Sequence, residues 1–269
     1  MKKIICPTDF TATADNAVVY AAKIAQHSGA TLTLFHVESL MEQALGVLAP
    51  LHSMQEPALR LTELSEQVRK VFHISCEADV QRSARSAIAV IAEEATSYDL
   101  IVMGSNGPHD IVQFFIGSHT YRTARQALPP LLLIPNECAY ATAAKTVFAF
   151  DYLKSGVLPL EQVLDFTRAV GSGLTVLQIV TGHYTREAEI KLERMAEALS
   201  VAEPDANLVF DTVYASELVP SLDSYMLRNQ ADVLALCTQD HGFLEGMFHK
   251  STIKAMTVIA EYPLLITHR

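Results

Sequence analysis

Short uninterrupted runs of apolar residues recur along the chain and alternate with longer amphipathic stretches. In the first half these runs lie at 4–6, 31–37, 100–103 and 131–134. The run at 100–103 lacks the alternation of apolar and polar residues that marks a half-exposed strand, which indicates a parallel sheet covered on both faces, and 31–37 is rich in β-branched residues. A further strand is predicted at 73–80. The stretch from about Thr13 to Gly29 and the stretch 84–96 each place apolar residues on one helical face. Strands separated by helices predict right-handed crossovers and a doubly wound α/β sheet.

The second half of the chain repeats the first. Segments 2–10, 29–37, 99–105 and 129–135 resemble segments 144–152, 171–180, 232–238 and 262–268, in the same order and at a spacing of about 133 to 143 residues. One such match would mean little, but four in order indicate a duplicated domain. We therefore expect two tandem domains, 1–138 and 143–269, with their boundary in the small and polar stretch 136–144.

Charge and cysteine usage exclude several classes of function. The net charge is −10 with no cluster of basic residues, which disfavours binding to nucleic acid or to an anionic membrane surface. The four cysteines are far apart and form no Cys/His cluster, so neither a metal site nor a disulfide framework is predicted. No apolar run approaches the ~20 residues of a membrane helix. The apolar run after Lys2 and Lys3 is too short for a signal peptide, and we expect a cytoplasmic protein.

Candidate binding chemistry lies in residues 104–120, GSNGPHDIVQFFIGSHT. Gly104 ends a predicted strand, and Gly117 precedes a predicted helix that Ser118 can cap. Glycine lets backbone approach an anion closely, and a helix N-terminus attracts phosphate. Asp9 ends the first strand and should reach the same rim, where a carboxylate suits ribose hydroxyls. The alternative stays open, because glycines in turns and an aspartate that caps the next helix are common in α/β proteins.

These features together resemble the universal stress protein (UspA-like) family. The residues that carry the resemblance are Pro7-Thr8-Asp9, Leu34-Phe35-His36-Val37, Gly104-x2-Gly107-x9-Gly117-Ser118 and the segment 130–135. The resemblance covers the whole first repeat, and the chain as a whole looks like a tandem universal stress protein.

The resemblance implies a Rossmann-like sheet of the adenine nucleotide alpha hydrolase-like kind, with five parallel strands in the order 3-2-1-4-5. It also implies binding of an adenine nucleotide, ATP or AMP, alone or with Mg²⁺. By position, Asp9 would contact the ribose, and the Val37 backbone would contact the adenine. Met103 and Gly104 would line the ribose side, and Pro7 would shape the pocket edge. The phosphates would be held by Gly107, Gly117, Ser118 and the His119 N–H. One departure is Pro108, which follows Gly107 where ATP-binding members often carry a basic residue.

The second repeat has lost this motif. Cys237, Asp240 and Lys250 stand where the first repeat has Gly104, Gly107 and Gly117, whereas Ser251 and Asp151 keep the places of Ser118 and Asp9. We therefore predict that the second domain is a partner that binds no nucleotide. In the family the last strands of two domains pair, so 131–134 and 264–266 would pair within this chain. The apolar residues between 41 and 54 suit either a lid or a homodimer contact.

No nucleophile elbow and no P-loop occur in the sequence, so we expect no catalytic residues and no enzyme, although slow ATP hydrolysis or autophosphorylation stays open. The first hypothesis is a stress-response protein that senses an adenine nucleotide and regulates a protein partner. The second is a nucleotide-free interaction module, and the third is a weak ATPase of the same broad fold.

Overall fold

The computed structural model describes residues 1–40, 56–105, 128–136, 138–140, 145–150, 160–181, 186–204, 207–238 and 250–268. The chain divides into two compact units, Met1–Tyr140 and Ala141–Arg269. This division falls inside the polar stretch 136–144, where the sequence predicts a domain boundary.

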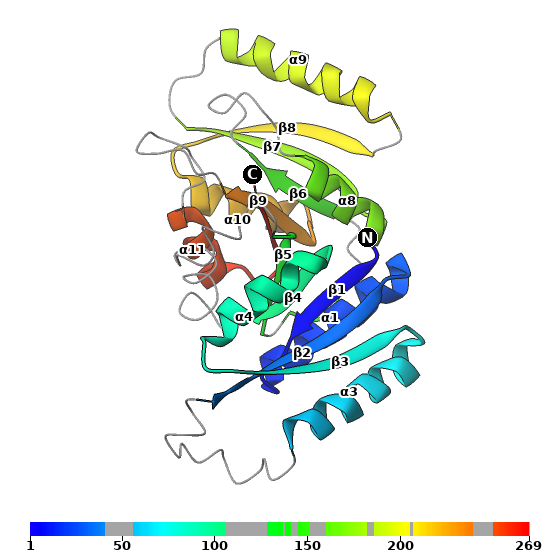
Figure 1. The fold of residues 1–269 in the computed structure, drawn as a ribbon. Coiled ribbons are helices and arrows are strands. Elements are labelled where there is room, and N and C mark those ends of the chain that lie inside the picture. Colours follow the sequence, from blue (N-terminus) through cyan, green and yellow to red (C-terminus); the bar gives the residue numbers. More distant parts are fainter. Residues whose placement is uncertain are drawn as a thin grey trace. The chain divides into compact units, whose positions relative to one another are not determined.

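Unit 1 is built on a parallel sheet (Figure 1). Its strands are β1 (Lys3–Pro7), β2 (Thr31–Ser39), β3 (Cys76–Ser83), β4 (Leu100–Ser105) and β5 (Leu131–Pro135). They lie in the order β3-β2-β1-β4-β5, and each neighbouring pair is parallel. The predicted strand order is confirmed. Strand order reverses at β1, which lies between β2 and β4, and ligands of such sheets bind beyond the carboxyl ends of the strands at this point.

The helices of unit 1 follow from local sequence signals. They are α1 (Ala12–Ser28), α3 (Pro57–Phe72), α4 (Ala87–Glu94) and the short η1 (Ala95–Ser97). Thr11 caps α1 by accepting a hydrogen bond from the Ala14 N–H, and Gly29 ends the helix in the left-handed conformation, with φ of 70°. This end is the one predicted, because glycine takes up positive φ without steric cost.

Two predicted boundaries in unit 1 are wrong by three residues. The strand predicted at 73–80 begins at Cys76, because His73 ends α3 in the left-handed conformation, with φ of 54°. The helix predicted at 84–96 begins at Ala87, because the Ser83 hydroxyl accepts a hydrogen bond from the Arg85 N–H and holds a turn there. Both errors lie where a side-chain or backbone cap competes with the apolar pattern.

The core of unit 1 lies where the sequence has its apolar runs. Ile4 and Ile5 of β1, Leu32 and Leu34 of β2, and Leu100 of β4 are fully buried. Right-handed crossovers place α1 and α3 on one face of the sheet and α4 on the other, so these strands are covered on both faces.

Unit 2 repeats this architecture. Its strands are β6 (Lys145–Ala149), β7 (Gly173–Thr181), β8 (Leu208–Ala215), β9 (Val233–Thr238) and β10 (Leu264–His268), and its helices are α8 (Glu161–Val170), α9 (Arg186–Ala202), α10 (Leu218–Arg228) and α11 (Lys250–Ile259). The order is β10-β9-β6-β7-β8, again with parallel neighbours. The register matches too: Lys145 pairs with Gly173 as Lys3 pairs with Thr31. No helix in the described part of the chain is long and apolar enough to cross a membrane.

Candidate functional site

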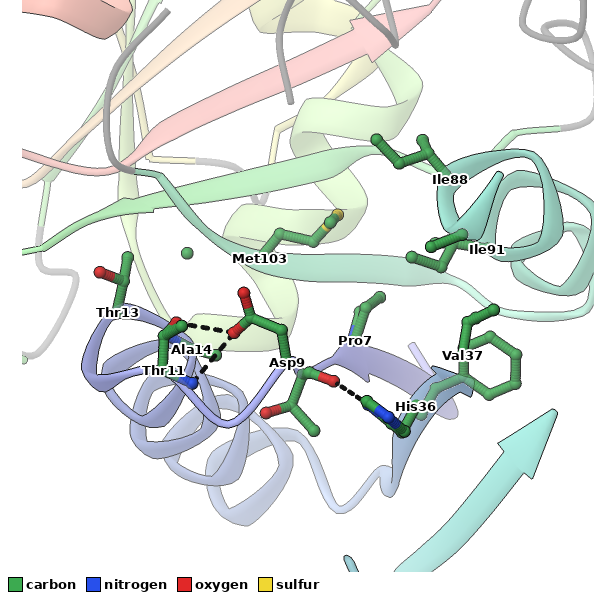
Figure 2. A pocket seen from close by; sticks show the side chains of 14 residues that line it. Pro7, Asp9, Thr11, Thr13, Ala14, His36, Val37, Ile88, Ile91 and Met103 are labelled. Carbon is green, nitrogen blue, oxygen red and sulfur yellow. Dashed lines mark hydrogen bonds between the residues drawn. The ribbon is translucent and has the colours of Figure 1, made fainter. Parts of the chain in front are cut away.

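A pocket of about 250 Å³ opens at the carboxyl edge of the unit 1 sheet, at the point where strand order reverses. Residues from the ends of β1, β2 and β4 and from the starts of α1 and α4 line it (Figure 2). The lining residues are Pro7, Thr8, Asp9, Thr11, Thr13, Ala14, Phe35, His36, Val37, Ala87, Ile88, Ile91, Met103 and Gly104. The site is therefore formed by segments that lie far apart in the sequence.

One side of the pocket is apolar. Phe35 and Val37 come from β2, and Ile88 and Ile91 come from the facing helix α4. In Figure 2 the side chains of Val37 and Ile91 lie close to each other, and Ile88 lies above them. Such a surface suits a flat, weakly polar group, because ligand pockets combine apolar walls with a few placed polar groups.

Asp9 supplies the carboxylate on the other side. Its Oδ1 accepts hydrogen bonds from the Thr11 N–H at 3.0 Å and from the Thr11 hydroxyl at 2.6 Å. Figure 2 shows that the other carboxylate oxygen points away from Thr11, toward the side where Met103 lies. One oxygen thus fixes the carboxylate to the start of α1, and the other faces the pocket. Thr11, and not Asp9, is the N-cap of α1, so Asp9 acts on the helix start by holding this N-cap residue.

Gly104 brings α1 and β4 into close approach. A Cβ atom at this position would lie 2.5 Å from the Thr13 carbonyl oxygen and 2.7 Å from the Thr13 Cγ2. Real Cβ atoms do not come that close to backbone, so residue 104 must be glycine for the first turn of α1 to lie here. The approach also places Thr13 and Ala14 in the pocket wall.

The charged side chains that line the described part of the pocket are of one sign, negative. Asp9 is the only carboxylate among the described residues that line the pocket, and no lysine or arginine lines it there. Over the described part of the chain no group of three or more His, Cys, Asp and Glu side chains could hold a metal ion.

The structure brings together five of the predicted site residues: Pro7, Asp9, Val37, Met103 and Gly104. The other four, Gly107, Gly117, Ser118 and His119, lie outside the described residues. Thr11, Thr13, Phe35 and His36 also line the pocket but were not predicted as site residues. Ile88 and Ile91 belong to the apolar face predicted for the helix at 84–96. Two sequence features could have predicted these lining residues: Thr11 directly precedes a helix, and Phe35 and His36 lie next to Val37.

The matching edge of unit 2 is built differently. Ala149 and Phe150 take the places of Pro7 and Thr8, and Cys237 takes the place of Gly104. The Phe150 N–H donates to the Leu177 carbonyl as the Thr8 N–H donates to the Phe35 carbonyl, which confirms the correspondence. A separate pocket of about 20 Å³ lies between Phe150, β7, β8 and α9, the helix that follows β7 as α3 follows β2. That volume holds about one water molecule.

Comparison with known families now decides the assignment. The sequence profile of the universal stress protein family matches residues 1–135. This chain belongs to the universal stress protein family. The predicted family and its fold are therefore confirmed, and the site described above lies within the matched part of this universal stress protein.

Solved structures share the fold over the full length of the chain. A universal stress protein from Archaeoglobus fulgidus DSM 4304 is 14% identical with a TM-score of 0.71, and the match covers 99% of this chain and 98% of that one. A protein from Pseudomonas aeruginosa UCBPP-PA14 with the same family name is 16% identical with a TM-score of 0.62, over 100% and 93%. The cytoplasmic domain of a prokaryotic cation chloride cotransporter is 8% identical with a TM-score of 0.53, over 98% and 94%. No curated protein matches the chain.

Proposed function

We propose that unit 1 of this universal stress protein binds an adenine nucleotide, ATP or AMP, in the pocket at the edge of its sheet. The observation that carries the proposal is the pairing of a fixed carboxylate, Asp9, with an apolar wall across a pocket of about 250 Å³. The adenine lies against Phe35, Val37 and Ile91, and the ribose hydroxyls donate to Asp9. The phosphates extend toward the glycines that follow Gly104.

The charge of the pocket supports a role for Asp9 in holding ribose rather than phosphate. A carboxylate repels phosphate, but it accepts hydrogen bonds from hydroxyl groups, and charge-assisted bonds of this kind are the stronger ones. Phosphate groups would rely on backbone N–H groups and on Mg²⁺ that arrives with them. Magnesium here supplies charge neutralisation to a bound triphosphate.

The lining threonines favour a sensor over an enzyme. The Thr11 hydroxyl caps α1, the Thr13 hydroxyl donates to the Asn136 side chain at 2.8 Å, and the Thr8 hydroxyl accepts from the Phe10 N–H at 3.1 Å. Each of these groups thus has a structural role in forming the pocket. We propose that the bound nucleotide changes the contacts of this protein with a protein partner in a stress response, and that unit 2 binds no nucleotide.

Pairing of β5 with β10 within the chain belongs to the same proposal. Both strands are short and apolar. Strand edges of this kind invite association unless another strand covers them. Self-association of the whole chain into a homodimer stays a prediction, and so does the cytoplasmic location.

Calorimetric titration of AMP and of ATP, each with and without Mg²⁺, tests the proposal. Asp9→Asn keeps an oxygen that can accept from Thr11 but removes the charge, and we expect about tenfold weaker binding because a charge-assisted hydrogen bond is lost. The matched control is Asp15→Asn, an exposed carboxylate in the first turn of α1 that does not line the pocket. One equivalent bound by the wild type and by Asp15→Asn supports the proposal.

Two other results would favour a different function. Absence of binding to the wild type up to low-millimolar nucleotide would overturn the proposal and favour a nucleotide-free interaction module. ATP turnover by the wild type that is lost in Asp9→Asn would favour a weak ATPase instead.

A further inference from the structure

Phe10, the residue directly after Asp9, has a left-handed backbone with φ of 64°. This conformation is unfavourable for an L-residue with a bulky side chain, because its Cβ crowds the backbone. A non-glycine residue stays there only when its surroundings impose the conformation, and such residues concentrate at functional sites. The contacts of Phe10 therefore indicate what the protein gains from this turn.

Two side chains from other elements hold the Phe10 ring. The His36 ring of β2 lies with its centroid 4.7 Å from that of Phe10, at an interplanar angle of 41°. The Arg60 guanidinium of α3 lies 4.4 Å from the Phe10 ring centroid, a cation–π distance. Arg60 also donates through Nη2 to the Phe10 carbonyl oxygen at 3.4 Å. We call His36 and Arg60 the Phe10 clamp.

The clamp is tied to the end of β1 through Thr8. The Phe10 N–H donates to the Thr8 hydroxyl oxygen at 3.1 Å, and the His36 Nδ1 bonds to the Thr8 carbonyl oxygen at 2.8 Å. Figure 2 shows the His36 ring directed at this carbonyl, away from the apolar wall. Both neighbours of Asp9 in the sequence are thus fixed by the same clamp.

The left-handed turn at Phe10 is what lets Thr11 fold back onto Asp9. The Thr11 N–H lies two residues after Asp9 and donates to its Oδ1, as in an Asx-turn. If Phe10 moved to negative φ, the Thr11 N–H would turn away and the carboxylate would lose the bond that sets its direction. The clamp therefore controls which way Asp9 points.

We infer that Arg60 and Phe10 are positioning residues for nucleotide binding: they act on the ribose only through Asp9, an inference that rests on the proposed function. Arg60 does not line the pocket. Its contribution is to hold Phe10 in a strained conformation before the ligand arrives, so that binding need not order the carboxylate.

A double-mutant cycle between Arg60 and Asp9 tests the inference with adenosine, AMP and ATP as ligands. We expect Arg60→Ala to weaken binding of all three ligands by about fivefold, the size of an exposed cation–π contact. In the Asp9→Asn background the same change should have a smaller effect, because Arg60 acts through that carboxylate. The matched control is Lys70→Ala, which removes a cation from the last turn of the same helix and should leave affinity unchanged.

Phe10→Gly supplies a second background. Glycine occupies positive φ without strain and needs no clamp, so Arg60→Ala should not change affinity in a Phe10→Gly protein. Equal losses from Arg60→Ala in the wild type, Asp9→Asn and Phe10→Gly backgrounds would overturn the inference. Weakened binding of ATP with unchanged binding of adenosine would also overturn it, since Arg60 would then contact phosphate directly.

Hydrogen exchange separates this inference from the proposed function. If the wild type binds no nucleotide, the proposed function fails, but the clamp still predicts faster exchange of the Thr11 amide in Arg60→Ala than in the wild type or Lys70→Ala. An unchanged Thr11 exchange rate in Arg60→Ala would overturn the positioning role whatever the ligand result.

Discussion

At the carboxyl end of β1, unit 1 has Pro7 and Thr8, whereas β6 of unit 2 ends in Ala149, followed by the buried ring of Phe150. The aspartate itself does not differ, because Asp151 keeps the sequence position of Asp9. At the end of β4, unit 1 has Gly104 in contact with the first turn of α1, whereas β9 has the buried Cys237. A pocket of about 250 Å³ lies beside these unit 1 residues. The two units share strand order and register but not the chemistry of the sheet edge.

The shared features are those that fold the sheet. In unit 1 the Asp99 carboxylate accepts a hydrogen bond from the Lys3 N–H at 3.0 Å, and in unit 2 the Asp232 carboxylate accepts one from the Lys145 N–H at 2.9 Å. These aspartates precede β4 and β9 and join them to the starts of β1 and β6. The comparison teaches that the buried strands carry the fold, whereas a few residues at the strand ends decide whether a ligand can bind.

Copying the unit 2 residue into unit 1, as Gly104→Cys, should have the largest effect. A side chain at 104 meets the Thr13 backbone, so the first turn of α1 must move, and we expect a loss of about 2 kcal/mol or more in the free energy of unfolding of unit 1. Nucleotide binding should be lost with it. Urea titration read by hydrogen exchange of unit 1 peptides gives the stability, and calorimetry gives the binding.

Gly104→Ala controls for the nature of the added side chain, because its Cβ meets the same atoms. If either variant kept wild-type stability and affinity, the close approach of α1 to β4 would not be what separates the two units.

Asn16→Ala should have a smaller effect, confined to unit 1. The Asn16 amide donates to the carbonyl oxygens of Pro135 at 3.1 Å and Cys138 at 2.9 Å, and so ties α1 to the chain after β5. Unit 2 has Leu158 at the matching sequence position. We expect unit 1 to lose about 1–2 kcal/mol, because two partly buried acceptors lose their donor.

Gln26→Ala is the matched control for Asn16→Ala, because it removes one exposed hydrogen bond, to the Phe72 carbonyl, at the other end of α1. A loss of stability no greater for Asn16→Ala than for Gln26→Ala would contradict the structural role of Asn16.

The smallest expected effect on stability comes from the aspartate that both units have before the fourth strand, Asp99 in unit 1 and Asp232 in unit 2. Burial acts to raise the pKa of the Asp99 carboxyl, but the hydrogen bonds from the Lys2 and Lys3 N–H groups outweigh it and place the pKa below its ordinary value of 3.8. A carboxyl with a lowered pKa in the folded state stabilises the fold above its unfolded pKa, and this contribution is lost as pH falls through the folded pKa.

Asp99→Asn should therefore cost about 0.5 kcal/mol at neutral pH, a value limited by the exposure of the carboxylate. The difference from the wild type should shrink below about pH 4. Urea titrations between pH 2.5 and pH 7 would measure it, with Asp232→Asn as the counterpart in unit 2. A difference that grows on acidification would contradict the assignment.

Most of the fold was predictable because its strands are continuous apolar runs. The strands at 4–6, 31–37, 100–103 and 131–134 lie where the sequence places them, since burial on both faces leaves few polar positions in them. The order of the strands came from the family resemblance rather than from the pattern itself.

The site was only partly predictable. Asp9 and Gly104 belong to motifs that the family shares, so the sequence predicted them as site residues. Ile88 and Ile91 read as ordinary core residues, because periodicity shows that a side chain is buried but not which cavity it faces. The left-handed Phe10 gives no sequence signal at all, since its conformation is imposed by His36 and Arg60 from distant segments.

Hydrogen exchange of the whole chain with and without AMP tests the central claim most directly. The account predicts that AMP slows exchange in peptides that cover 8–14, 35–37 and 87–91 of unit 1. Peptides that cover 149–150 and 177–179 at the matching edge of unit 2 should exchange at unchanged rates. Slowed exchange at both edges, or at the unit 2 edge alone, would contradict the claim that the strand-end residues of unit 1 make the nucleotide site.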